Sequence, residues 1–102
     1  MNQSHIVKIT CSPSGDFTFD PDPVVVRRGD NVEWVCTNDY PFAVHLGWSS
    51  PFLKGRYRAP GRSKVSDRIP ENAHYGDYKY FVAVFDGENI WTDDPRIIVR
   101  RP

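Results

Sequence analysis

A run of cationic side chains between residues 54 and 68 is the feature of this sequence best suited to chemistry with a ligand. The segment KGRYRAPGRSKVSDR carries six cations against one acid, Asp67, whereas the whole chain balances 13 basic with 13 acidic residues. Cations interleaved with aromatic rings are typical of surfaces that bind phosphates, stacked bases or acidic proteins. The candidate partner-binding residues are Trp48, Lys54, Arg56, Tyr57, Arg58, Arg62, Lys64 and Arg68.

Several kinds of partner suit this segment. The net charge is zero, so the chain lacks the excess positive charge typical of proteins that bind nucleic acids or membranes. We therefore expect another protein as the partner and no membrane contact, with an anionic polymer such as single-stranded nucleic acid as an alternative. Exposed Trp48, Tyr57 or Trp91 would instead suit a carbohydrate. The simplest interpretation of the charges is a solvated loop that keeps a sheet edge soluble.

The spacing of reactive residues gives little support to an enzyme or a metal site. No serine or cysteine lies in a nucleophile elbow, no glycine-rich phosphate loop occurs, and Cys11 and Cys36 lack the C-x-x-C spacing of zinc sites. We expect a non-catalytic protein without a cofactor, in which both cysteines are buried free thiols. No segment resembles a signal peptide or a membrane span, so we expect the chain as written in the cytoplasm, or in the periplasm or outside the cell if a signal peptide has been removed.

The elements that position these residues are strands. Nine prolines and seven glycines punctuate the chain, and no segment shows the apolar spacing of an amphipathic helix. Alternating apolar residues predict strands at 5–11, 17–19, 24–26, 32–36, 78–85 and 96–100. These patterns favour one all-β domain over residues 1–102, a Greek-key sandwich or barrel of about seven strands.

Two segments lead to more specific expectations, one for a central strand and one for an irregular excursion. The run YKYFVAVF at 78–85 is so rich in apolar residues that it predicts a central strand covered on both faces. Residues 46–73 are dense in Gly, Pro, Ser and Arg. We expect them to form an irregular basic excursion that carries the partner-binding residues.

Two motifs resemble those of the cupredoxins. The pattern F-x-P-x-x-V-x-V-x-x-G-D-x-V-x-W runs from Phe19 to Trp34. The run GDYKYF at 76–81 is similar to the G-x-Y-x-Y strand that leads into the copper-binding cysteine of that family. The resemblance, which rests on these two segments, implies a cupredoxin-like Greek-key sandwich, with an immunoglobulin-like sandwich as the alternative.

The resemblance also implies where that family would bind copper, and this sequence departs from the pattern at each point. A blue-copper site uses two histidines and a cysteine, with a weak axial methionine. By the family's spacing, the histidine and cysteine positions fall at Phe42, Val82 and Phe85, and the chain's one methionine is Met1. We therefore expect a copper-free, cupredoxin-like binding or structural module, in which these apolar side chains fill the end of the sandwich, and not copper-dependent electron transfer.

Overall fold

The computed structural model describes residues 2–47 and 49–102. Within these residues the chain forms eleven short strands and no helix. The strands are β1 Ser4–Cys11, β2 Phe17–Asp20, β3 Val24–Val26, β4 Asn31–Cys36, β5 Phe42–His45, β6 Arg56–Ala59, β7 Lys64–Arg68, β8 Gly76–Lys79, β9 Phe81–Phe85, β10 Ile90–Asp93 and β11 Arg96–Val99. The described part of the chain therefore has no helix that could cross a membrane.

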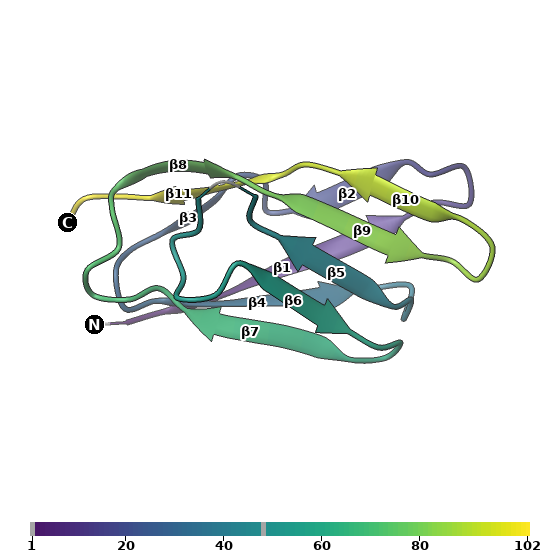
Figure 1. Ribbon diagram of the computed structural model, residues 1–102, viewed down its shortest axis with the longest axis horizontal. Coiled ribbons are helices and arrows are strands. Elements are labelled where there is room, and N and C mark those ends of the chain that lie inside the picture. Colours follow the sequence, from purple (N-terminus) through teal and green to yellow (C-terminus); the bar gives the residue numbers. More distant parts are fainter. Residues whose placement is uncertain (1, 48) are drawn as a thin grey trace.

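The strands form three sheets in an elongated molecule (Figure 1). The first sheet has the strand order β2-β1-β4-β7, the second β10-β9-β5-β6, and the third β3-β11-β8. β1 pairs with β4, and β3 with β11, in parallel, while the other pairs are antiparallel. Each sheet ends in edge strands, so the fold is a sandwich and not a closed barrel.

Alternation along each strand decides which side chains fill the core. In β1 and β4 every second residue is buried, namely Val7, Ile9, Cys11, Val32, Trp34 and Cys36. The predicted inward faces of these two strands are confirmed, and both cysteines are buried free thiols. Trp34 lies at the centre of the core, because its ring contacts those of Phe52, Tyr57 and Tyr80.

The strand predicted over residues 78–85 is divided at Tyr80. β8 pairs with β11 and β9 pairs with β10 in the same antiparallel register, since Gly76 lies opposite Val99 and Phe85 lies opposite Ile90. The Tyr80 N–H donates to the Pro95 carbonyl at 3.1 Å, but Pro95 has no N–H to donate in return, so the ladder is interrupted there. Prolines likewise separate β2 from β3. The strands number eleven and not about seven because 78–85 is divided into two and because four strands, β5, β6, β7 and β10, lie in segments that the sequence pattern did not mark as strands.

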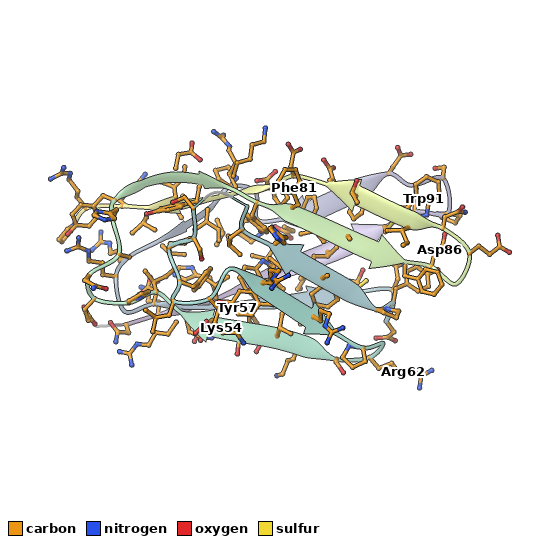
Figure 2. All side chains as sticks on the ribbon, viewed as in Figure 1. Lys54, Tyr57, Arg62, Phe81, Asp86 and Trp91 are labelled. Carbon is orange, nitrogen blue, oxygen red and sulfur yellow. The ribbon has the colours of Figure 1, made fainter. Side chains whose placement is uncertain are left out.

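The prediction that this strand is covered on both faces is wrong. In β9, Val82 and Val84 are fully buried, whereas Phe81 and Phe85 are 52% and 44% exposed. The second sheet is an outer layer of the sandwich, so one of its faces meets the core and the other meets solvent. Phe81 accordingly projects from the surface of β9 in Figure 2.

The prediction that residues 46–73 form an irregular excursion is also wrong, because they contain two regular strands. β6 buries Tyr57 and Ala59, and β7 half-buries Val65 and Asp67, each with the period of two that a strand requires. Charged residues at the alternate positions hide this period in the sequence. β6 forms one edge of the second sheet and β7 one edge of the first, so the basic segment is a pair of edge strands.

Candidate functional site

A groove with a volume of about 810 Å³ lies between β6 and β7. The two strands follow each other in the chain and run in opposite directions, yet they belong to different sheets (Figure 1). We call this feature the edge groove, and its lining residues are Lys54, Arg56, Tyr57, Arg58, Val65, Ser66 and Asp67. The sandwich is therefore open along the side where the basic segment lies.

The backbone groups on both walls of the edge groove are free. The Leu46 N–H donates to the Gly55 carbonyl at 2.8 Å. Because antiparallel pairing alternates, Tyr57 bonds to β5 while Arg56 and Arg58 direct their N–H and C=O groups into the groove. The register of β7 against β4 directs the backbone groups of Ser66 away from β4 in the same way, whereas the Arg68 N–H donates to Asp67 Oδ1 at 2.7 Å. Among the described residues, 2–47 and 49–102, no backbone hydrogen bond joins β6 to β7.

One side-chain contact spans the edge groove at its inner side. The Tyr57 hydroxyl donates to Asp67 Oδ2 at 2.5 Å, which links the second sheet to the first. Burial raises the pKa of Tyr57, and the bond to Asp67 and the charge of that carboxylate raise it further. The Tyr57 ring is 7% exposed and packs on Trp34, so the stacking role considered for it from the sequence does not fit its position.

We expect Tyr57→Phe to lower the free energy of unfolding by about 1.5 kcal/mol, because the change removes a hydrogen bond to a charged acceptor and keeps the ring in the core. Chemical denaturation of both proteins measures the difference. Asp67→Asn, which keeps a neutral acceptor for the hydroxyl, is the matched control and should cost less. Equal stability of Tyr57→Phe and the parent would show that this contact does not hold the two sheets together.

The cations of the basic segment differ in their partners. Lys64 Nζ lies 3.4 Å from Glu33 Oε1, and Arg68 lies 4.0 Å from Glu71 and also donates from Nε to the Gly29 carbonyl. The other four cations have no carboxylate within 4.0 Å among the residues that the structure describes. They are Lys54, Arg56, Arg58 and Arg62. Lys54 lies over the Tyr57 ring, with Nζ 5.2 Å from its centroid.

The structure brings together only part of the candidate set from the sequence. Lys54, Arg56, Tyr57 and Arg58 line the edge groove, whereas Arg62 lies in the turn beyond β6 (Figure 2). Lys64 and Arg68 lie on β7 outside the lining, and Trp48 falls outside the described residues. Sequence reasoning missed the groove residues Val65, Ser66 and Asp67. The sequence KVSDR offered little signal for them, because Val65 is its single apolar residue and polar residues at the other positions hide the strand period.

A second hollow lies on the solvent face of the second sheet. It has a volume of about 500 Å³, and we call it the outer hollow. The sequence did not indicate it, because its lining comes from four separate segments, and its apolar residues include Pro41, Ala43, Ala83, Phe85 and Ile90. Arg58 lines both the outer hollow and the edge groove, so the two features adjoin at β6.

Trp91, considered as a sugar-stacking residue, is half-buried in the structure. Its Nε1–H donates to Asp86 Oδ2 at 2.9 Å, and its ring lies so close to Gly15 that a Cβ atom there would come within 2.3 Å of it. Figure 2 shows Trp91 and Asp86 together at one end of the molecule. These contacts give Trp91 a structural role in joining the β9–β10 hairpin to the turn before β2.

The three positions at which the resemblance implies copper ligands do not converge. Phe42 and Val82 are buried on the inner face of the second sheet, whereas Phe85 lies on its solvent face. The expectation that all three fill the end of the sandwich is therefore wrong for Phe85. The reason is that β9 continues as a regular strand, in which residues 82 and 85 must point to opposite faces.

The side chains at these positions do not fit a copper ion. Phe and Val carry no donor atom for a metal, and Phe42 lies opposite Val84, where the two apolar side chains occupy the inner face. In the parts of the chain that the structure describes, no group of three or more His, Cys, Asp or Glu side chains lies close enough together to hold a metal ion.

Comparison with known proteins shows similarity of structure and not of sequence. No protein-family model and no curated protein matches the sequence. A pseudoazurin from Hyphomicrobium denitrificans superimposes with a TM-score of 0.60 and 18% identity over 97% of this chain and 77% of its own. A pseudoazurin from Sinorhizobium superimposes with a TM-score of 0.59 and 14% identity over 100% of this chain and 76% of its own. At these identities the similarity concerns the fold alone.

Proposed function

We propose that this chain, which has the cupredoxin fold that its motifs implied, is a non-catalytic module that binds another protein through the edge groove. The observation that carries the proposal is the pairing of two free strand edges with cations that lack carboxylate partners among the described residues. Free edges are normally shielded by charge, bulges or covering elements, because they pair readily with other chains. Here they line a groove large enough for a ligand.

Two observations favour a protein over the other partners. Single-stranded nucleic acids are held by exposed aromatic rings beside the cations, but the one aromatic residue among the described residues that line the edge groove, Tyr57, has its ring packed against Trp34 in the core. The outer hollow adds apolar surface next to Arg58, and a mixture of apolar and arginine surface is typical of protein interfaces. Electron transfer through copper is disfavoured by the apolar side chains Phe42 and Val82.

Site-specific photocrosslinking in the source cell tests this proposal. A photoreactive phenylalanine analogue at Ser66 places the probe in the edge groove, and the same analogue at Thr18 is the matched control. Both are exposed residues of the first sheet, but β7 and β2 form its opposite edges. We expect a defined protein adduct from the Ser66 probe and none from the Thr18 probe. Mass spectrometry identifies the adduct.

The result also separates the alternatives. Adducts with nucleic acid or glycan in place of protein would contradict the proposal in favour of those partners. Equal adducts from the Ser66 and Thr18 probes would indicate collision with abundant proteins and would contradict a specific role for the groove.

A further inference from the structure

We propose that the edge groove accepts an extended acidic segment of a partner protein, which adds to β6 as a new edge strand of the second sheet. The inference rests on the proposed function and specifies the chemistry of the partner. Strand addition to a free edge is a general mode of peptide recognition, in which backbone bonds provide affinity and alternate side chains provide specificity.

The backbone of β6 favours a peptide over other anionic ligands. Arg56 and Arg58 each direct both an N–H donor and a C=O acceptor into the groove. A peptide strand presents the same alternation of donors and acceptors and satisfies both kinds of group. The phosphates of a polynucleotide supply acceptors only, so they would leave the two carbonyl groups without donors.

The side chains of β6 define what the added strand must carry. Arg56 and Arg58 project to the solvent face of the second sheet, next to His45 and Ala43 on β5. Residues of an added strand that lie directly opposite them would stand at the same face, two positions apart. Acidic residues at these two positions would pair with the two arginines. The residue between the two acidic residues would point inward toward Val65, so an apolar side chain suits that position.

The surrounding surface extends this complementarity. Lys54 precedes β6 and Arg62 lies in the turn that follows it, so one further cation lies beyond each end of the strand (Figure 2). Arg58 also borders the apolar outer hollow. The partner segment therefore has the central pattern acidic, apolar, acidic, and further acidic residues on either side would strengthen binding without being required for it.

Binding of a labelled peptide to the full chain tests the proposal. The probe is acetyl-SEVEVS-amide, and the control peptide acetyl-SVEEVS-amide has the same composition with adjacent glutamates. We expect the alternating peptide to bind more tightly by fluorescence anisotropy. The double variant Arg56→Glu, Arg58→Glu should bind it at least about tenfold more weakly, because two cross-strand attractions become repulsions. Lys8→Glu, which reverses an exposed cation on β1, should leave the affinity unchanged.

Amide hydrogen exchange gives a readout that a purely electrostatic contact would not change. In the free protein the N–H groups of Arg56 and Arg58 should exchange rapidly, while that of Tyr57, paired with β5, should be protected. Saturation with the alternating peptide should slow exchange at Arg56 and Arg58 and leave Tyr57 unchanged. Binding without this protection would overturn strand addition.

Two further outcomes would also overturn the inference. One is equal affinity for the two peptides, and the other is arginine-dependent binding of oligothymidylate with no binding of the peptide. Failure of the peptide together with a specific protein adduct at Ser66 would reject the acidic strand and leave the proposed function standing. Absence of any protein adduct would reject the proposed function itself.

Discussion

Trp34→Ala is expected to lower the free energy of unfolding by about 4 kcal/mol, the largest effect of any single substitution in this molecule. The Trp34 ring is fully buried, and its centroid lies 5.6 Å from that of Phe52, 5.5 Å from Tyr57 and 5.9 Å from Tyr80. Truncation removes these contacts and leaves a cavity where the two largest sheets meet. Since domains of this size are stable by about 5–15 kcal/mol, this loss removes a substantial fraction of the total stability. Thermal and urea denaturation measure the loss.

Trp34→Phe separates the volume of the side chain from its polar group. The Trp34 Nε1–H donates to the Tyr80 hydroxyl at 3.1 Å inside the core. We expect Trp34→Phe to cost less than Trp34→Ala, and Tyr80→Phe to cost less in the Trp34→Phe background than in the parent, because the hydrogen bond is already absent. Additive effects of the two substitutions would show that this bond contributes nothing to stability. A small loss for Trp34→Ala would mean that the ring is not central to the core.

Asp30→Ala is expected to have the second largest effect, a loss of about 3 kcal/mol, because it removes a buried and fully bonded carboxylate. The residue is 4% exposed. It accepts hydrogen bonds from the N–H groups of Gln3 and Arg27, each at 3.0 Å, and from His5 Nε2 at 2.8 Å. These bonds join the start of β1 to the turn between β3 and β4. Glu88→Ala, at an exposed position on the β9–β10 turn, is the control and should change stability by less than about 0.5 kcal/mol.

The contribution of Asp30 should also depend on pH. Burial raises the pKa of this carboxyl, but the hydrogen bonds from Gln3, His5 and Arg27 outweigh it, and the pKa is lowered in the folded protein. The unfolded-state pKa is about 3.9. The stabilisation is therefore complete above that value and is lost as the pH falls through the lower folded-state pKa.

Denaturation of the parent and of Asp30→Ala between pH 2 and pH 7 checks this prediction. The difference in unfolding free energy between the two proteins should be largest near neutral pH and should shrink below about pH 4. Asp86 and Asp94 also have lowered pKa values, because of hydrogen bonds from the Asn89 backbone and from Lys79 respectively. They are present in both proteins, so their effects cancel in the difference. A difference that stays constant with pH would contradict the assignment to Asp30.

The candidate site could be predicted only in part. Clustered charge identified the chain segment, and Lys54, Arg56 and Arg58 do line the edge groove. The groove itself could not be foreseen, because it depends on β6 and β7 joining different sheets although they are neighbours in the chain. Asp67, which reads as the lone acid in a basic run, proved to be the acceptor for Tyr57.

By itself, the sequence determined the all-β class, the inward faces of β1 and β4, and the apolar character of the positions that hold copper in cupredoxins. The first two follow from residue type and from spacing along one strand, which do not change when the strands are assembled, whereas the third is implied by the resemblance to the cupredoxins. Only the tertiary structure decided that Phe81 and Phe85 meet solvent, that Phe85 is separated from Phe42 and Val82, and that the basic segment forms two facing edges. The burial of a side chain depends on which layer packs against its face of the sheet, and the pairing of a strand depends on which strand edges meet. Both are set by several chain segments together, so neither can be read from one segment.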